Sequence, residues 1–320
     1  MIRTLVSAAV VSLVMQVALA GHLKLETSPA SFELVAEGDA NITLGIVAMD
    51  KLVNPHLNGI ALAGTMPTES AIIFKPNGRA IFAYSDLFLR EFRGRDQVLN
   101  SKDAHGRPAE DFLHFPKDAK LPKFLRDIWK VNATHLCMNW REDILWWTGE
   151  LIYRFDFAFP VISLKLESTS GKRTTVGDWE WEKVGRAVKI FASTDGENWT
   201  LIWQSHGKGG RTAVDAQLPP DMKGAKTVFI KFWGQNANVL FDLYVTAELE
   251  ARDASSLLKL QKGINRFEFR DAPESSHRAF VFWEGKGVKA KRAPRRFTYP
   301  RKRTTVKVSD DEIEIRFPEG

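Results

Sequence analysis

The stretch from Gly177 to Glu182 has the residue types and spacing best suited to ligand binding. In an extended strand, successive side chains point to opposite faces. Trp179 and Trp181 then share one face, and the opposite face presents three carboxylates: Asp178, Glu180 and Glu182. Such a platform suits a sugar, which stacks on aromatic rings and hydrogen-bonds through its hydroxyls, and its acids are also the oxygen ligands that Ca²⁺ takes. An edge strand with solvated acids and inward-packed tryptophans has the same pattern, so both interpretations stay open.

A second pair of tryptophans, Trp146 and Trp147, stands in the stretch Leu145–Glu150. Neighbouring side chains of a strand point to opposite faces, so the two rings cannot both face inward. Binding residues also concentrate where a rigid scaffold presents them at its surface. We therefore add Trp146 and Trp147 to the predicted ligand-binding residues.

Catalysis is the alternative for the same acids. Glycoside hydrolysis needs two carboxylates about 5–10 Å apart. Acids are plentiful around the tryptophans, and no spacing singles out a pair among Glu142, Asp143, Glu150, Asp178, Glu180 and Glu182. The sequence contains no Gly-x-Ser-x-Gly elbow, His-Glu-x-x-His helix or phosphate-binding loop, and its one cysteine does not suggest a zinc site. No catalytic residue or metal ligand is therefore assigned, and no cofactor is predicted beyond Ca²⁺.

The positive charge is concentrated near the C-terminus. The segment from Lys286 to Lys307 contains ten of the 45 Lys and Arg residues and no acid, so the other 35 face 39 Asp and Glu, a net charge of −4. A basic segment of this kind is either a solvated tail or a salt-sensitive contact for an anionic surface. The candidate contacts are Arg295, Arg296, Arg301, Lys302 and Arg303.

The elements that position these residues are predicted to be strands. Between Leu151 and Val245, runs of β-branched and aromatic residues alternate with polar ones and are separated by turn-forming residues. This pattern, without long helical periodicity, is typical of an all-β sandwich or barrel. The runs are 151–157, 161–166, 187–192, 199–203, 212–217, 227–233 and 239–245, with further strands at 31–46, 71–83, 265–270, 278–283 and 312–317.

Four of these features together resemble a known family. They are the Trp-bearing stretch 139–150, the strands 153–157 and 161–166, the strand 187–192 with its following turn, and the strand 228–233. The chain resembles the discoidin or coagulation-factor type C family, and more broadly the galactose-binding-like jelly rolls, over roughly residues 133–248. The most recognisable element is Ser-x-Asp-Gly-x-x-Trp, matched by Ser193, Asp195, Gly196 and Trp199. The resemblance implies a jelly-roll β-sandwich, here with N- and C-terminal β extensions, and a non-catalytic role in binding glycans or cell surfaces.

Local physics gives further expectations. Asp195-Gly196 is a hairpin turn signal, because glycine accepts a positive φ without steric cost. Trp199 begins the next strand, and its four-residue spacing from Trp203 predicts that both rings lie on one face, in the core. Trp233 and Trp283 are also assigned to the core. Near 123–130 we predict a short helix.

The N-terminus predicts export. Arg3, the apolar run from Leu5 to Val17 and Ala18-Leu19-Ala20 are the three parts of a signal peptide cleaved before Gly21. The run is shorter than the roughly 20 residues that cross a bilayer, so no transmembrane segment is predicted. The expected parts are the signal peptide 1–20, a β-rich region 21–132 that forms its own domain or completes the sandwich, the sandwich 133–250, and a C-terminal extension 251–320 with the basic segment 286–307.

These expectations favour a secreted, periplasmic or cell-surface protein. The predicted function is non-catalytic binding of a carbohydrate or a surface, with a glycan or an anionic surface polymer as the partner. Export argues against nucleic acid. A polysaccharide-active hydrolase or lyase on a jelly roll is the alternative, and a structural surface or matrix protein is the third possibility.

Overall fold

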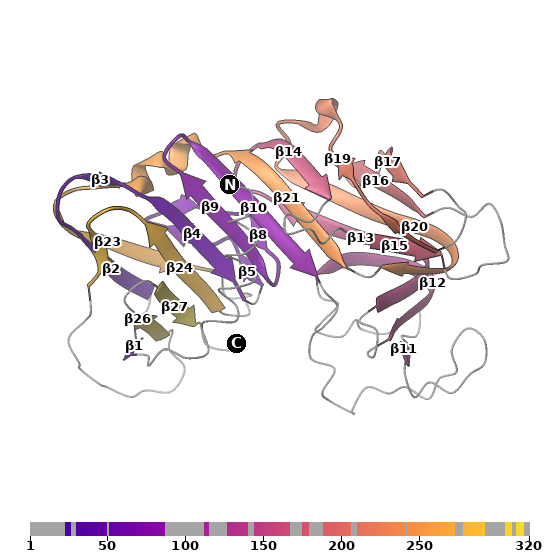
Figure 1. Ribbon diagram of the computed structural model, residues 1–320, viewed down its shortest axis with the longest axis horizontal. Helices are drawn as coiled ribbons and strands as arrows, with labels where there is room; N and C mark the ends of the chain where they lie inside the picture. The colour runs from indigo at the N-terminus through magenta and orange to yellow at the C-terminus, as the bar shows by residue number, and fades with distance from the viewer. Residues whose placement is uncertain are drawn as a thin grey trace. The chain divides into compact units, whose positions relative to one another are not determined.

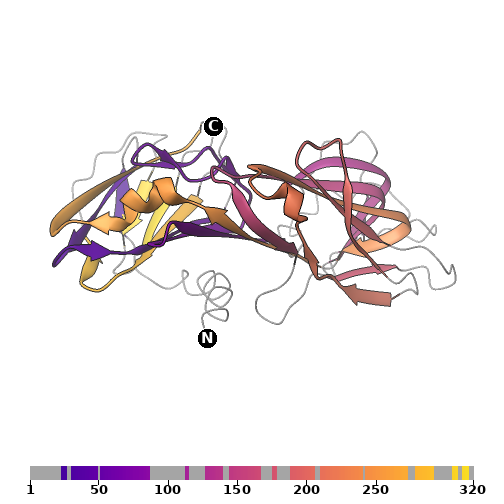
Figure 2. The same cartoon turned by 90° about the horizontal axis from the view of Figure 1, so that it is seen from above.

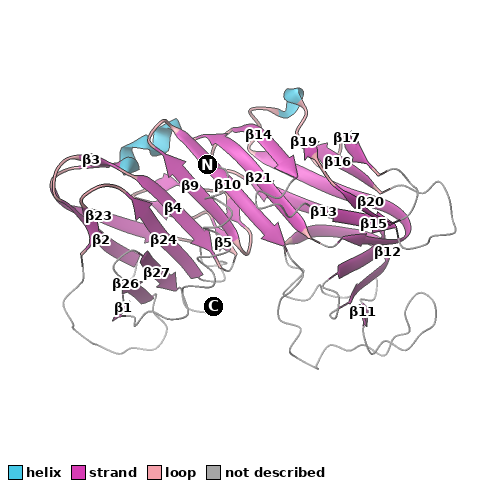
Figure 3. Cartoon of the chain, in the orientation of Figure 1, coloured by secondary structure: helices cyan, strands magenta, loops and turns pink. Residues whose placement is uncertain are grey.

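A computed structural model of the protein describes residues 23–26, 30–49, 51–86, 112–114, 127–139, 144–166, 175–178, 188–205, 210–240, 242–272, 278–291, 305–308 and 312–316. Strands dominate this part of the chain, which has two short 3₁₀ helices, η4 (Pro220–Met222) and η5 (Arg252–Leu258) (Figure 3). The all-β prediction is confirmed. No helix of the described residues is long and apolar enough to cross a membrane. The predicted signal peptide lies outside them.

The chain folds into two compact units. Unit 1 comprises residues 1–84, 156–163 and 247–320, and unit 2 comprises residues 85–155 and 164–246. The N-terminal and C-terminal thirds of the chain therefore contribute to the same unit.

The first sheet of unit 1 joins strands from both ends of the sequence. Its antiparallel order is β1–β26–β27–β24–β4–β9–β10 (Figure 1). The strands are β1 (Leu23–Glu26), β4 (Thr43–Ala48), β9 (Ser70–Lys75), β10 (Arg79–Asp86), β24 (Arg278–Glu284), β26 (Thr305–Val308) and β27 (Glu312–Arg316).

The central strands of this sheet are apolar on both faces. Leu44 and Ile46 of β4 are fully buried on one face, opposite Phe74 and Ile72 of β9. On the other face, a cluster contains Val47, Ala71 and Phe280, with Met49 and Phe282 packed against it. Gly45 makes room there: its partner Phe282 lies over it so closely that a Cβ would overlap the ring. Burial on both faces explains why these strands read as continuous apolar runs.

The second sheet of unit 1 has the order β25–β2–β23–β6–β7. In Figure 2 this sheet lies in a layer of its own, apart from the first sheet. Its inward residues alternate with polar ones, and Phe32 stacks on Phe267 across β2 and β23 with ring centroids 5.0 Å apart. The strands are β2 (Ala30–Ala36), β6 (His56–Leu57), β7 (Ile60–Ala61), β23 (Gly263–Arg270) and β25 (Val288–Ala290); short pairs also join β3 (Ala40–Asn41) to β22 (Lys259–Leu260) and β5 (Leu52–Val53) to β8 (Thr65–Met66).

Unit 2 is built on a sheet in the order β11–β12–β13–β20–β15–β18. The first part of the long strand β20 pairs with β16, which pairs with β17, and its last residues pair with β15. Strand β14 pairs antiparallel with β19. The strands are β11 (Phe112–His114), β12 (Ile128–Asn139), β13 (Ile144–Asp156), β14 (Val161–Leu166), β15 (Thr175–Asp178), β16 (Lys189–Ser193), β17 (Thr200–Gln204), β18 (Gly210–Ala213), β19 (Ala216–Gln217), β20 (Thr227–Leu240) and β21 (Leu243–Glu250).

The core of unit 2 is aromatic. Tyr153 and Trp147 each approach Phe232 edge to face, at centroid distances of 6.0 and 6.4 Å. All three rings are fully or almost fully buried. Asn238, also buried, donates from its side-chain amide to the backbone oxygen of Trp147. Edge-to-face packing of this kind adds to the hydrophobic contribution of the buried rings.

One predicted element is wrong. The short helix expected near 123–130 is contradicted at its C-terminal end, because β12 begins at Ile128. Trp129 and Lys130 are therefore strand residues, and both are exposed.

Candidate functional site

One face of the unit 2 sheet carries aromatic rings and basic side chains side by side. Strand alternation produces it: Ile230 and Phe232 of β20 are buried on the inner face, while Phe229, Lys231 and Trp233 lie on the outer face. Their partners on β16 share that face, and β12, β13 and the β16–β17 hairpin complete it. We call this surface the aromatic–basic face and define it by Trp129, Glu150, Arg154, Lys189, Phe191, Trp199, Leu201, Phe229, Lys231 and Trp233.

Lys231 stands at the centre of the aromatic–basic face. Its Nζ lies 4.1 Å from the ring centroid of Trp199 and 5.1 Å from that of Phe191. The same Nζ lies 3.3 Å from Oε1 of Glu150. Only 12% of the Lys231 side chain is exposed, so this cation–π and ion-pair geometry is partly shielded from solvent. Glu150 and the two rings together hold the ammonium group in place.

Trp129 is the most accessible ring of this face. It is 46% exposed, and its centroid lies 5.0 Å from that of Phe229, which is buried beneath it. Trp199 approaches Phe229 edge to face at 6.5 Å. Arg154 places its guanidinium carbon 5.6 Å from the centre of the Phe229 ring. The buried Phe229 ring thus supports two tryptophans and one exposed cation.

The pattern repeats at β16. Lys189 and Trp233 are directly paired on β16 and β20, and Nζ of Lys189 lies 5.4 Å from the centre of the Trp233 ring. Leu201, 48% exposed, sits opposite Phe191 on β17. Exposed apolar surface therefore lies at two places on this face, at Trp129 and at Leu201.

The turn of the Ser-x-Asp-Gly-x-x-Trp element is internally satisfied. Ser193 Oγ accepts hydrogen bonds from the backbone N–H groups of Asp195 and Gly196. The Asp195 carboxylate accepts hydrogen bonds from the side-chain amide of Asn198 and from backbone N–H groups of Asn198 and Glu197, which hold the pKa of Asp195 well below its usual value. Gly196 has φ +79°, as the turn requires. This element shapes the hairpin that presents Trp199.

A bulge overturns one prediction about the tryptophans. Trp203 pairs with Ile190, but Leu201 pairs with Phe191, so Ile202 is an extra residue in β17. The extra residue breaks the alternation, placing Trp203 beside the inner-face Ile190 and Trp199 on the outer face. The prediction that Trp199 and Trp203 share a core face is wrong. Trp233 also lies on the outer face, half-buried, rather than in the core.

Among the residues predicted to bind ligand, Trp147 is the one whose side chain the structure describes. Trp147 is fully buried and packs as a core residue against Phe232, so its ring is not presented to a ligand. Trp146 lies in β13 and Asp178 ends β15; the structure describes their strands and not their side chains. Outside the described residues lie Trp179, Glu180, Trp181 and Glu182, and the basic contacts Arg295, Arg296, Arg301, Lys302 and Arg303.

No metal cluster supports the Ca²⁺ prediction in the part of the chain that the structure describes: no three His, Cys, Asp or Glu side chains there are placed to hold an ion.

Sequence reasoning missed Trp129, Trp199 and Trp233 as surface residues. Trp129 was placed in a predicted helix, although the run Ile128–Cys137 alternates apolar and polar residues in part. The signal that could have found Trp233 is the sequence Phe-Ile-Lys-Phe-Trp, in which Phe229, Lys231 and Trp233 share one face at period two.

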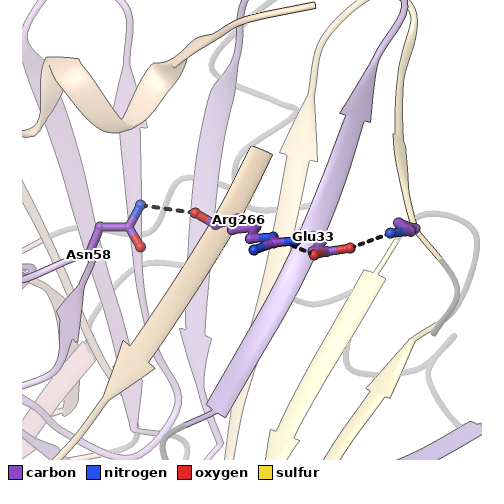
Figure 4. Close-up of polar contacts among 4 residues, drawn as sticks. Glu33, Asn58 and Arg266 are labelled. Carbon is purple, nitrogen blue, oxygen red and sulfur yellow. Dashed lines mark hydrogen bonds and ion pairs between the residues drawn. The ribbon is translucent and has the colours of Figure 1, made fainter. Parts of the chain in front are cut away.

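Unit 1 has a polar face of a different kind. On β2 and β23, Glu33 Oε1 accepts from Arg266 Nε at 2.9 Å, and Glu33 Oε2 lies 2.8 Å from Lys291 Nζ (Figure 4). Asn58, in the β6–β7 turn, donates to the backbone oxygen of Arg266 and accepts from the backbone N–H of Glu268. We call this surface the paired-charge face and define it by Glu33, Arg266, Glu268, Arg270 and Lys291.

No protein-family model matches the chain, and no curated protein matches it. The case for a function therefore rests on the geometry above.

Proposed function

We propose that the protein is a non-catalytic carbohydrate- or surface-binding protein and that the aromatic–basic face of unit 2 is its binding surface. The observation that supports this most directly is Trp129, a 46% exposed indole backed by the buried Phe229 ring. Exposed apolar surface bordered by polar side chains, as Trp129 and Leu201 provide on this face, is a feature of interaction sites. Sugars bind to such rings because one face of a pyranose is apolar.

The sheet gives this surface the rigidity that binding favours. The rings come from adjacent strands or from a hairpin whose turn is fixed by its own hydrogen bonds. Side chains already held in place lose little conformational entropy when a ligand arrives. Binding is therefore expected without rearrangement of the face.

The face has the chemistry of binding rather than of glycoside hydrolysis. Of its ten residues only Glu150 has a carboxylate, whereas hydrolysis uses two. Both Glu150 oxygens have partners: Oε1 faces Lys231 and Oε2 accepts from the amide of Asn132 at 3.2 Å. A reducing-sugar assay over a polysaccharide panel tests this directly, since turnover would establish the hydrolase or lyase alternative.

Replacing Trp129 by Ala tests the binding surface. On a glycan array, we expect the affinity for bound glycans to fall by about tenfold or more, because truncating a central aromatic residue removes most of its contact energy. The melting temperature should change little, since the ring is half-exposed. Ile264→Ala is the matched control: Ile264 is an apolar side chain of β23 in unit 1, 51% exposed.

A second variant separates this surface from the one predicted in the sequence. The double change Trp179→Ala and Trp181→Ala removes the predicted two-ring platform. If that variant loses binding while Trp129→Ala binds like the wild type, the aromatic–basic face is not the site and the 177–182 stretch is. If the wild-type protein binds neither a glycan nor an anionic surface polymer, the proposed function is refuted.

A further inference from the structure

We propose that Asn58 is a deamidation site and that its conversion to aspartate or isoaspartate releases the β6–β7 hairpin from β23. Asparagine followed by glycine favours this reaction, because glycine has no Cβ to keep its nitrogen away from the asparagine side chain. The sequence contains two such pairs, Asn58-Gly59 and Asn77-Gly78. Both lie in unit 1, so the inference does not depend on the function proposed for unit 2.

Asn58 and Gly59 are the two central residues of the turn between β6 and β7. Leu57 pairs with Ile60 across this turn, and the two central residues have φ values of +50° and +79°. Positive φ at both positions is the type I′ geometry, for which Asn-Gly is a preferred sequence. Both residues are exposed, and no described residue beyond the chain neighbours lies within 4 Å of the position that a Cβ of Gly59 would take. Water and hydroxide therefore have access to the peptide bond between them.

The reaction begins when hydroxide takes the proton of the Gly59 backbone nitrogen and this nitrogen attacks the side-chain carbonyl carbon of Asn58. The new carbon–nitrogen bond closes a succinimide ring. The bond from the same carbon to Nδ2 breaks, and Nδ2 takes a proton from water and leaves as ammonia. A second water molecule then opens the ring at either carbonyl, which yields aspartate or isoaspartate. Water and hydroxide are the only co-reactants.

Two features of the structure favour this reaction at Asn58. Within the described part of the chain the Gly59 N–H group donates no hydrogen bond, so its nitrogen loses no partner when it attacks. Asn58 Oδ1 accepts from the backbone N–H of Glu268 at 2.8 Å. Negative charge develops on this oxygen during the attack, and a donor already aimed at it lowers the barrier. The other side-chain bond, from Nδ2 to the backbone oxygen of Arg266, is longer, at 3.3 Å (Figure 4).

Asn77-Gly78 is the same dipeptide in a less reactive setting. Gly78 is buried, and its backbone N–H donates to the Lys75 oxygen at 3.1 Å. Arg252 covers it, with Cγ 3.3 Å from the position that a Cβ of Gly78 would take. This nitrogen must lose its hydrogen bond before it attacks, whereas the nitrogen of Gly59 need not. Asn77 is therefore an internal control for Asn58.

Deamidation should weaken the attachment of the hairpin to β23. The backbone N–H of Asn58 donates to the Glu268 oxygen at 2.9 Å, and its side chain both donates to Arg266 and accepts from Glu268. A carboxylate cannot donate, so the oxygen that replaces Nδ2 would meet the carbonyl oxygen of Arg266. Isoaspartate also adds a methylene group to the backbone of the turn. The strand pairing of β6 with β23 covers two residues, Leu57 and His56, so the bonds of Asn58 are a large part of the attachment.

The first experiment follows both asparagines in the full chain. The protein is kept in mildly alkaline buffer, and its peptides are assigned over time by mass spectrometry. We expect Asn58 to deamidate about fivefold or more faster than Asn77, the ratio that corresponds to one hydrogen bond on the attacking nitrogen. In urea, where the structure is lost, the two rates should become similar. Equal rates in the folded protein, or a ratio that urea leaves unchanged, would overturn the inference.

The variants Asn58→Asp and Asn77→Asp test the consequence. Asn58 uses both its side-chain nitrogen and its oxygen, whereas Asn77 uses its oxygen to accept from the backbone N–H of Arg79, which a carboxylate also does. Amide hydrogen exchange at Glu268 and in β6 should therefore be about fivefold or more faster in Asn58→Asp and unchanged in Asn77→Asp. Aged wild-type protein, in which Asn58 is partly converted, gives the same comparison without a variant. Exchange at the wild-type rate in both Asn58→Asp and the aged protein would overturn the proposed release of the hairpin.

Discussion

The paired-charge face of unit 1 and the aromatic–basic face of unit 2 use their basic side chains differently. Both faces arise from strand alternation over a buried inner face. On unit 1, Arg266 and Lys291 meet the carboxylate of Glu33 (Figure 4). On unit 2, Lys231 meets one carboxylate and two rings, while Lys189 lies over the Trp233 ring.

We propose that this difference bears on which surface takes an external partner. Ion pairs between side chains that are largely exposed contribute about 0–1 kcal/mol each and leave no charge uncompensated. On unit 1, the ion pairs of Glu33 join neighbouring strands of the sheet. A ring holds a cation in position and leaves its charge available to an anion. Basic side chains over rings therefore indicate a binding surface more clearly than basic residues as such.

Replacing a buried tryptophan of unit 2 should give the largest change in stability, and replacing an exposed one on the aromatic–basic face should give a much smaller change. Trp147→Ala should lower the free energy of unfolding by about 3–5 kcal/mol, because it leaves a cavity in the aromatic core of unit 2. Urea denaturation followed by circular dichroism measures the change. Trp129→Ala is the comparison, since its ring is half-exposed, and should cost far less stability while reducing binding. Equal stability losses would mean that Trp129 is a core residue and not a ligand contact.

A substitution of Gly196 tests whether the hairpin turn needs a residue that accepts a positive φ. Its φ of +79° strains any residue with a Cβ, and that Cβ would touch the Phe229 ring at 3.4 Å. Gly196→Val should therefore lower stability by roughly 1–3 kcal/mol. It should also weaken glycan binding, because Phe229 and Trp199 support the aromatic–basic face. Gly38→Val is the control, at a glycine with open space around the Cβ position.

A Gly196→Val protein that is as stable as the wild type would contradict the importance of the positive φ. One that loses stability but keeps full binding would show that the hairpin can shift without disturbing the face.

The sequence predicted the strands well because alternation is a local property. The run 161–166 is β14 with the same bounds, and the runs 187–192 and 199–203 correspond to β16 (Lys189–Ser193) and β17 (Thr200–Gln204). The Asp195-Gly196 turn was also readable, since glycine after aspartate is a strong local signal.

The faces of those strands could not be predicted, because they depend on pairing. The bulge at Ile202 is set by how β17 aligns with β16, and it reverses the side on which Trp199 lies relative to Trp203. The exposure of Trp129 could not be predicted either, because it requires residues 128–130 to form a strand rather than a helix. The pairing of β12 with β13 makes them a strand. The candidate site therefore depends on strand register, which determines which side chains share a face. The sequence pattern alone had favoured the 177–182 stretch.

Glu33 gives the smallest expected effect and tests the paired-charge face itself. Lys291 and Arg266 hold the pKa of Glu33 below its usual value, mainly through the hydrogen bond from Lys291. Glu33→Gln should lower stability at pH 7 by less than about 1 kcal/mol, because Arg266 and Lys291 are themselves exposed. Urea denaturation of both proteins between pH 3 and 8 measures the difference.

The pH dependence has a definite sign. Because the folded-state pKa of Glu33 lies below its unfolded-state value, the folded protein binds fewer protons at this group, and the stabilisation is complete only above the unfolded-state pKa, near 4.5. It is lost as the pH falls through the folded-state pKa, so wild type and Glu33→Gln should converge in acid. Glycan binding at pH 7 should be unchanged, since Glu33 lies outside the aromatic–basic face and pairs with Arg266 and Lys291. A Glu33→Gln protein with altered glycan binding would show that the paired-charge face also takes part in recognition and would remove the contrast between the two faces.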